Sequence, residues 1–196
     1  MPHKFDPARR ARLEDPARAE LLPPEQLLRH GGLRPGMRLA DVGCGPGFFT
    51  IPAAAIVGPA GRVYAVDISE EMLQAVREKV TASGYTNVTT LRATEDALPL
   101  PDGAADFALL AFVLHEAADQ PAFAREVARI VARGGRVLLL DWDRREMEVG
   151  PPVADRVSPE DAQAVLEAAG FSVVETFQPN TLHYGLIGVA TGEVEA

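Results

Sequence analysis

A short apolar strand followed by three closely spaced glycines constrains the fold of this chain more than any other feature. The run Leu39-Ala40-Asp41-Val42 leads into glycines at positions 43, 45 and 47, and a helical pattern begins directly after them. Glycines at such a turn permit backbone angles closed to other residues, and they let a ligand lie against the main chain. A strand, a glycine turn and a helix in this order are typical of nucleotide-like cofactor sites in doubly wound α/β folds.

Alternating strand and helix patterns fill the rest of the chain. The sequence predicts strands at 38–42, 63–66, 88–92, 107–113 and 137–140, and two final strands at 171–177 and 182–190. Helices alternating with strands predict a mostly parallel sheet covered on both faces. The last two strands are joined only by residues 178–180, a link so short that it forces antiparallel pairing. Residues 38–196 are therefore expected to form one α/β domain.

The first 37 residues are predicted to form a helical extension. Asp6-Pro7 and Asp15-Pro16 each place an aspartate that can cap a helix before a proline that suits its first turn. A third helix is expected near 24–30. Because such short helices do not persist alone, they must pack on the main domain. We expect residues 1–37 to act as a lid over the site.

Composition narrows the classes of partner. Among 196 residues, 28 are acidic and 19 basic, so the net charge is −9 and a polyanion such as DNA or RNA meets net repulsion. The single cysteine, Cys44, has no internal partner for a disulfide, and no run approaches the ~18 apolar residues of a membrane span. These observations predict a cytoplasmic protein. No cluster has metal-ligand spacing, so no metal is expected, and the oligomeric state stays open.

The spacing of the glycines distinguishes between families. The dinucleotide fingerprint places its third glycine one residue later, where this chain has Phe48. This difference and the antiparallel last strand argue against a nicotinamide dehydrogenase. Gly43, Gly45 and Gly47 with Asp41 two residues ahead closely resemble the first motif of the class I S-adenosylmethionine (SAM)-dependent methyltransferases. The order of motifs over about residues 24–190 is similar to the small-molecule branch typified by the ubiquinone/menaquinone-biosynthesis enzymes (methyltransferase type 11). The resemblance implies SAM as cofactor and a seven-stranded sheet of order 3-2-1-4-5-7-6 with the last strand antiparallel.

The resemblance also implies which residues bind the methionine and ribose parts of the cofactor. The glycine turn, Cys44 included, is expected to pass under the methionine part, with Asp41 helping to hold its ammonium group. Asp67 ends the second strand, and its carboxylate can accept hydrogen bonds from the two ribose hydroxyls. Ile68 is expected on the adenine face, and Phe112, near the end of the fourth strand, completes the set.

This chain departs from the family pattern at the position of the expected adenine partner. The family often carries an aspartate in the loop after the third strand, and Thr94 stands in its place here. Glu95, Asp96 or the backbone with Thr94 are the alternatives, and we favour Glu95.

Residues of the acceptor side follow the fourth, fifth and seventh strands. His115 is the best-placed candidate base, since a hydroxyl or thiol acceptor must lose a proton, although a histidine here also suits a contact with backbone or with the cofactor carboxylate. The Asn/Asp-Pro-Pro-aromatic motif common in methyltransferases of DNA-base nitrogens or glutamine is absent. The residues expected to line an acceptor pocket are Trp142, His183 and Tyr184, with Phe5 or Phe49.

The sequence thus predicts a SAM-dependent methyltransferase that moves a methyl group to a small-molecule acceptor by in-line displacement. A SAM-binding protein without catalysis, such as a sensor or partner subunit, is an alternative, because no residue here is chemically indispensable. A protein or RNA methyltransferase is disfavoured by the net charge and by a chain too short for a recognition domain.

Overall fold

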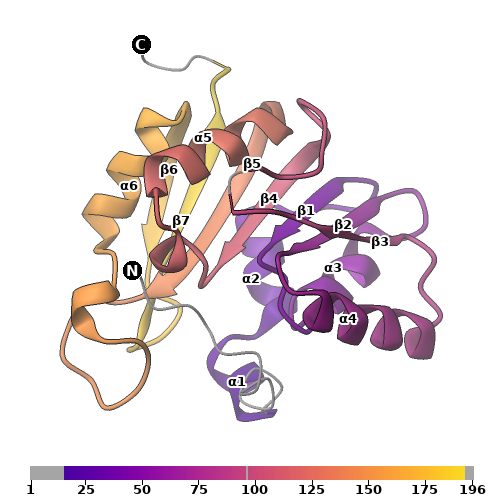
Figure 1. The fold of residues 1–196 in the computed structure, drawn as a ribbon, viewed down its shortest axis with the longest axis horizontal. Coiled ribbons are helices and arrows are strands. Elements are labelled where there is room, and N and C mark those ends of the chain that lie inside the picture. The colour runs from indigo at the N-terminus through magenta and orange to yellow at the C-terminus, as the bar shows by residue number, and fades with distance from the viewer. Residues whose placement is uncertain (1–15, 96, 193–196) are drawn as a thin grey trace.

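The computed structural model describes residues 16–95 and 97–192, which form a seven-stranded sheet of order β3-β2-β1-β4-β5-β7-β6 (Figure 1). The strands are β1 (Arg38–Val42), β2 (Arg62–Asp67), β3 (Val88–Arg92), β4 (Ala105–Ala111), β5 (Val131–Trp142), β6 (Phe171–Phe177) and β7 (His183–Ala190). The pairs among β1 to β5 are parallel, and β7 pairs antiparallel with both β5 and β6. This confirms the predicted fold class, strand order and reversed last strand.

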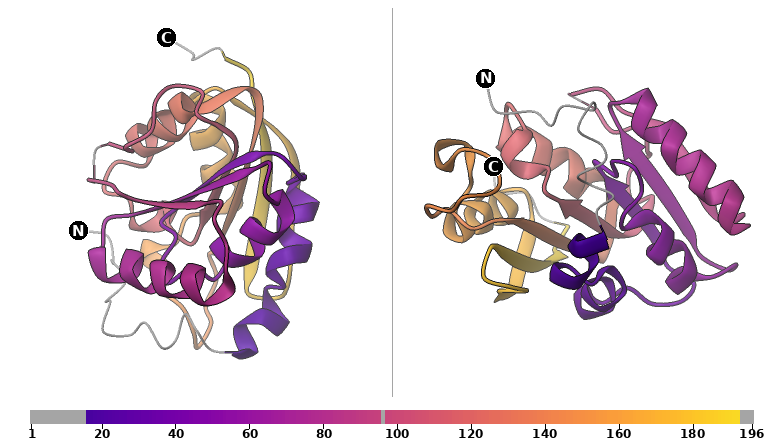
Figure 2. Two further views of the ribbon diagram at one scale, coloured as in Figure 1. Left: turned by 90° about the vertical axis from the view of Figure 1, so that its right-hand side faces the viewer. Right: turned by 90° about the horizontal axis from the view of Figure 1, so that it is seen from below.

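Helices cover both faces of the sheet (Figure 2). They are α1 (Pro16–Leu21), α2 (Pro24–Gly31), α3 (Thr50–Val57), α4 (Glu70–Ser83), α5 (Gln120–Ile130) and α6 (Pro159–Ala168), with 3-10 turns η2 (Leu114–Glu116) and η3 (Val153–Asp155). Apolar residues of α2 and α3 pack on one face of the sheet, and those of α4 pack beside them on the same face. Apolar residues of α5 and α6 pack on the other face. No helix in the described ranges is long and apolar enough to cross a membrane.

Side-chain caps fix where three of these helices begin. The side chains of Ser69, Asp119 and Ser158 accept hydrogen bonds from backbone N–H groups in the first turns of α4, α5 and α6. Each cap satisfies a donor that has no partner within the helix. The caps therefore fix the residue at which each loop from the sheet edge ends and its helix begins.

The fourth and fifth strands differ most from the prediction. The fourth strand ends at Ala111 rather than at residue 113, because Phe112 adopts a left-handed backbone angle (φ +63°) that breaks the extended conformation. The fifth strand begins at Val131 rather than at residue 137, so it includes the Gly134-Gly135 pair. Here Val131 already pairs with Ala105, and the glycines lie in a register shift of the sheet.

The two described helices of the N-terminal extension have different surroundings. Leu27 and Leu28 of α2 are buried at 6% and 0% exposure and contribute to the core between α3 and the sheet. Helix α1 lies toward the end of the sheet at which β1 and β4 finish (Figures 1 and 2). The helix predicted after Asp6-Pro7 lies outside the described residues.

Candidate active site

The glycine turn after β1 is held against β2 by its own backbone. The N–H groups of Gly43 and Cys44 donate to the Val66 carbonyl at 2.8 and 3.0 Å. Gly43, Gly45 and Gly47 all have positive φ angles, +72°, +51° and +89°, which L side chains rarely adopt. A Cβ on Gly43 would also lie 2.9 Å from Cγ2 of Val113. Both the backbone angle and the space at Gly43 therefore require glycine.

Asp67, at the end of β2, ties this turn to the start of α4. Its Oδ2 accepts a hydrogen bond from Gly45 N and its Oδ1 accepts one from Ser69 N, both at 2.8 Å. Burial raises the pKa of Asp67, and these backbone hydrogen bonds oppose that rise. Because each carboxylate oxygen has two lone pairs, Asp67 retains capacity to accept further hydrogen bonds.

Asp41 lies beneath the same turn and is almost completely buried, at 2% exposure. It accepts a hydrogen bond of 2.6 Å from the Thr50 hydroxyl at the start of α3. Burial raises the pKa of Asp41 to about 7; the Thr50 hydrogen bond lowers it, the charge of Asp67 raises it and the charge of Arg18 lowers it. Asp41 therefore changes its charge close to neutral pH.

The loop after β3 meets the same edge. Ala93 N donates to the Asp67 carbonyl at 3.0 Å, and Thr94 N closes a tight turn by donating to the Ala97 carbonyl at 3.2 Å. Thr94 and Glu95 are exposed there. Ile68, next to Asp67, leaves 46% of its surface exposed, which is high for so large an apolar side chain. Asp96 lies outside the described residues.

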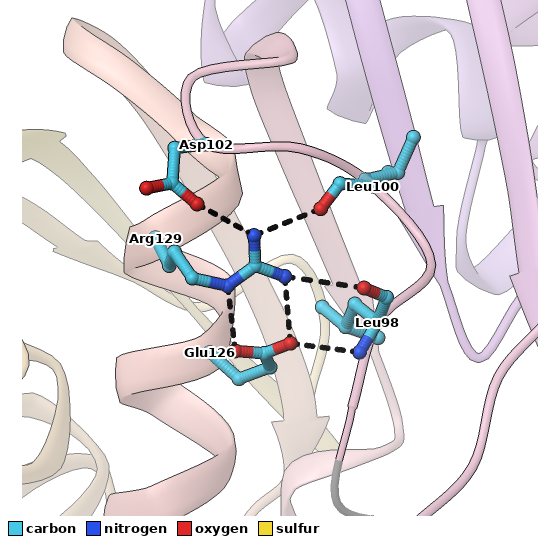
Figure 3. A network of polar contacts seen from close by, with 5 residues as sticks. All are labelled: Leu98, Leu100, Asp102, Glu126 and Arg129. Carbon is cyan, nitrogen blue, oxygen red and sulfur yellow. Dashed lines mark hydrogen bonds and ion pairs between the residues drawn. The ribbon is translucent and has the colours of Figure 1, made fainter.

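Helix α5 fixes the far part of that loop (Figure 3). The Arg129 guanidinium donates to the carbonyls of Leu98 and Leu100, at 3.1 and 2.8 Å, and to the Asp102 carboxylate at 2.8 Å. Glu126 accepts from Arg129 and from Leu98 N, at 2.7 and 2.9 Å. Helix and loop are thus joined through side chains whose role no local sequence pattern indicates.

His115 and Asp141 form a buried pair where β4 and β5 end. His115 Nδ1 and Asp141 Oδ1 are 2.7 Å apart, and the two residues are 4% and 1% exposed. Trp142 N also donates to Asp141 Oδ1, at 2.8 Å, which holds the carboxylate in place. Burial lowers the pKa of His115, but the hydrogen bond and charge of Asp141, with the charges of Glu116 and Asp155, outweigh this and raise it. The pair therefore stabilises the protonated ring.

An aromatic cluster, Phe112, Trp142 and His183, lies at the ends of β4, β5 and β7. The ring of His183 lies 5.0 Å from that of Phe112 and 4.4 Å from that of Trp142. It is 4% exposed, and neither ring nitrogen has a hydrogen-bond partner in the part of the chain that the structure describes. Burial, together with the charges of Arg18 and Arg156, lowers the pKa of His183 to about 4. The ring is therefore neutral at physiological pH.

Comparison with known proteins places this arrangement in a family. A family model described as a methyltransferase domain matches residues 40–139. The crystal structure of a SAM-dependent methyltransferase from Aquifex aeolicus is 36% identical to this chain; the match covers 95% of this chain and 99% of that one, with a TM-score of 0.90. This chain belongs to the SAM-dependent methyltransferases. Family membership implies S-adenosyl-L-methionine as the cofactor, as the sequence predicted.

Two further proteins resemble this chain, one in sequence and one in fold. A ubiquinone/menaquinone biosynthesis C-methyltransferase UbiE from Shewanella woodyi is 35% identical over 132 residues, which are 67% of this chain and 53% of that protein. The chain thus spans about half the length of such relatives. The [4+2]-cyclase SpnF has the same fold at 18% identity and a TM-score of 0.76, with 91% of this chain and 82% of SpnF covered.

The methyltransferase brings together most, but not all, of the residues that the sequence singled out. Asp41, the glycine turn and Asp67 meet at one sheet edge with the loop that begins at Ala93. Trp142 and His183 meet Phe112 in the aromatic cluster. Tyr184, the next residue on β7, points to the opposite face and is buried in the core under α5 and α6.

The phenylalanines of the glycine turn are arranged differently from the expectation. Phe49, predicted for the acceptor pocket, is 3% exposed and packs in the core with α2 and α3. Its neighbour Phe48 is the one whose ring meets the Arg18 guanidinium, 4.4 Å from its centroid. Phe5 lies outside the described residues.

Sequence reasoning missed Asp141 and Arg18. Asp141 had a local signal, an acid directly after the apolar run 137–140, beside the Trp142 that was singled out. Arg18 had none, because only the fold brings α1 to the glycine turn. Within the described ranges, no group of three or more His, Cys, Asp or Glu side chains is placed to hold a metal.

Proposed function

We propose that this methyltransferase transfers the methyl group of SAM to a small-molecule acceptor by in-line displacement. The observation that carries the proposal is the convergence of the three predicted cofactor segments: Asp67 accepts from Gly45 N of the glycine turn, and the Asp67 carbonyl accepts from Ala93 N of the loop after β3. These bonds join the ends of three strands into one edge, the position at which doubly wound sheets bind nucleotide-like ligands.

The side chains at this edge offer the chemistry that SAM requires. The Asp41 carboxylate suits the ammonium of the amino-acid end, and the positive-φ glycines leave the main chain open to it. Asp67 retains acceptor capacity for the ribose hydroxyls, and the exposed Ile68 offers an apolar surface for adenine. We assign the adenine amino group to Thr94 or Glu95, which are exposed in the adjacent turn.

His115 is the proposed general base, and Asp141 positions it. A carboxylate only accepts hydrogen bonds, so the 2.7 Å contact places the ring hydrogen on Nδ1 and leaves Nε2 to take a proton from the acceptor. When bound, the cofactor supplies a sulfonium methyl that a nucleophile displaces in line. Aligning the reactants can contribute roughly 7–11 kcal/mol, and a base adds about 10²–10⁴-fold where the acceptor must lose a proton.

The remainder of the edge is assigned to the acceptor. The aromatic cluster and Phe48 present aromatic rings that suit a small acceptor beside a sulfonium cation. A small molecule is favoured over a nucleic acid because the net charge is −9. Residues 1–37 are proposed to close over this region, with α1 as the moving part, because Leu27 and Leu28 fix α2 in the core.

The test has two steps. Calorimetric titration with S-adenosylhomocysteine measures binding, and absence of binding at millimolar ligand would end the proposal. Transfer of labelled methyl from SAM is then assayed across a panel of phenols, thiols, amines and carbon acids. Removing residues 1–21 should leave the sheet folded and weaken acceptor turnover; unchanged turnover would discard the lid.

A SAM-binding protein without methyl transfer is the second candidate, and one observation favours it. SpnF shares the fold at 18% identity and is named as a [4+2]-cyclase, so the fold alone does not dictate methyl transfer. The two candidates differ in product. A methyltransferase releases S-adenosylhomocysteine in step with the methylated acceptor, whereas a protein that only binds the cofactor returns SAM unchanged from every mixture of the panel.

A further inference from the structure

Arg18 brings a half-buried positive charge from α1 to the glycine turn. Its guanidinium lies 4.4 Å from the ring centroid of Phe48, in that turn, and 5.4 Å from that of Phe112, after β4. It also interacts electrostatically with Asp41, and burial lowers the pKa of Arg18 to about 10, against the opposing effect of Asp41. An arginine remains charged at that value, so the chain keeps a partly desolvated cation at this edge.

The cation and Asp41 together form a pair of opposite charges next to the open main chain of Gly43–Gly47. The amino-acid end of SAM carries an ammonium and a carboxylate on one carbon. Asp41 has the sign that suits the ammonium, and a guanidinium fork suits a carboxylate in both charge and geometry. The two aromatic rings hold the guanidinium by cation–π contacts, which restrict where it can point.

We propose that Arg18 binds the carboxylate of the cofactor's amino-acid end and thereby couples cofactor binding to the aromatic cluster. The coupling follows from the contacts: Phe112, one of the two rings under the guanidinium, lies 5.8 Å from the ring of Trp142 and 5.0 Å from that of His183. Through Arg18, helix α1 then contacts the cofactor carboxylate on one side and Phe112 of the aromatic cluster on the other. The proposal deepens the proposed function and rests on the binding of SAM at this edge.

The experiment compares two ligands that differ in the amino-acid end. S-adenosylhomocysteine carries the carboxylate, and 5′-methylthioadenosine has the same adenosine and thioether sulfur without the amino-acid end. We expect Arg18→Gln to weaken S-adenosylhomocysteine by about ten- to a hundredfold, as the loss of a charge-assisted pair does, and to change methylthioadenosine by less than about twofold. Arg18→Lys, which keeps the charge and loses the fork, should lie between.

A second readout needs no turnover. Trp142 is the single tryptophan of the chain, so its emission reports on the aromatic cluster directly. In the wild type, S-adenosylhomocysteine should change the Trp142 emission more than methylthioadenosine does; in Arg18→Gln the two ligands should give the same small change. Arg29→Gln is the matched control, because Arg29 is an exposed arginine of α2 paired with Glu25, and it should behave as the wild type in both measurements.

The outcomes separate the alternatives. Equal weakening of both ligands by Arg18→Gln would show a structural role for Arg18 and overturn the proposal, as would tighter binding of S-adenosylhomocysteine, which would make the guanidinium an obstruction. If Arg18→Gln binds S-adenosylhomocysteine as tightly as the wild type does, this inference is overturned and the proposed function stands. A wild type that binds neither ligand overturns both.

Discussion

The two halves of the sheet edge are built by different means. The half proposed to bind the cofactor, at the ends of β1, β2 and β3, is held by backbone hydrogen bonds and by three glycines with positive φ, and we call it the cofactor half. The acceptor half, at the ends of β4, β5 and β7, is made by side chains from distant parts of the chain, among them His115, Asp141 and His183. A site made by backbone leaves a local pattern in the sequence; a site made by convergent side chains does not.

The loop between β5 and α6 shows how the acceptor half is held. Arg156 is 4% exposed and donates to four backbone carbonyls, those of Asp143, Arg145, Val149 and Pro151. Its guanidinium lies 5.9 Å from the Trp142 ring, and a Cβ on Gly150 would lie 2.8 Å from that ring. One buried arginine therefore holds this loop against the aromatic cluster.

The largest effect is expected in the glycine turn. Gly43→Ala should abolish detectable cofactor binding and lower the free energy of unfolding by about 2–4 kcal/mol. Two costs combine: an alanine in this left-handed backbone conformation is strained by about 1–2 kcal/mol, and its Cβ would lie 2.9 Å from Val113. Gly36→Ala is the control, since Gly36 has φ +83° but nothing within 4 Å of its would-be Cβ; it should show the strain alone and normal binding. Urea unfolding and calorimetry measure both, and equal effects of the two variants would contradict the packing argument.

The corresponding change in the acceptor half is Arg156→Met, which keeps the side-chain volume and removes every donor. Leaving buried carbonyls unsatisfied costs about 1–3 kcal/mol each, so we expect a loss of about 3 kcal/mol after the loop relaxes. The KM for the acceptor should rise while the Kd of S-adenosylhomocysteine stays within about twofold, because the cofactor half does not depend on this loop. Arg145→Met, at an exposed ion pair with Asp143, should leave stability within about 0.5 kcal/mol. Loss of cofactor affinity in Arg156→Met would break the division into halves.

The same division explains what the sequence predicts and what it does not. The strand limits of β1 and β3, the caps at Ser69 and Asp119 and the positions of the glycine turn and Asp67 follow from patterns of a few neighbouring residues. Phe112 shows the limit of such patterns: its apolar character favours a longer strand, and only tertiary contacts hold it at φ +63°. The opposite faces of His183 and Tyr184 were implicit in the strand period, but which of them meets Trp142 depends on strand register.

The pH dependence of turnover tests the pair of the proposed base His115 and Asp141 in the acceptor half. The proposed base His115 must be neutral to act, so turnover should rise with pH through its raised pKa. Asp141→Asn removes the charge that raises this pKa, so the rise should move to lower pH. The plateau should fall by at least about tenfold, part of the ~10²–10⁴-fold that a base contributes, because the ring loses its orienting acceptor. Glu116→Gln is the control, since the carboxylate oxygen lies 3.9 Å from Nε2, and it should shift the profile less. An unmoved profile in Asp141→Asn would remove His115 as the titrating group.

The smallest effect concerns the charge of Asp41 in the cofactor half. With a pKa of about 7, Asp41 is mostly protonated at pH 6 and mostly ionised at pH 8, and only the ionised form attracts the ammonium of the cofactor. Binding of S-adenosylhomocysteine should therefore tighten by about tenfold from pH 6 to pH 8, and Asp41→Asn, which can still accept from Thr50, should bind weakly with no such slope. Asp106→Asn serves as control, because Asp106 pairs with Arg38 where β4 and β1 begin, at the opposite edge of the sheet, and its hydrogen bond to Arg38 lowers the pKa of Asp106 below this window. Its slope should match the wild type. If Asp41→Asn kept the tenfold slope, the titrating group would have to be another one, and the backbone of the glycine turn would hold the cofactor without help from this buried charge.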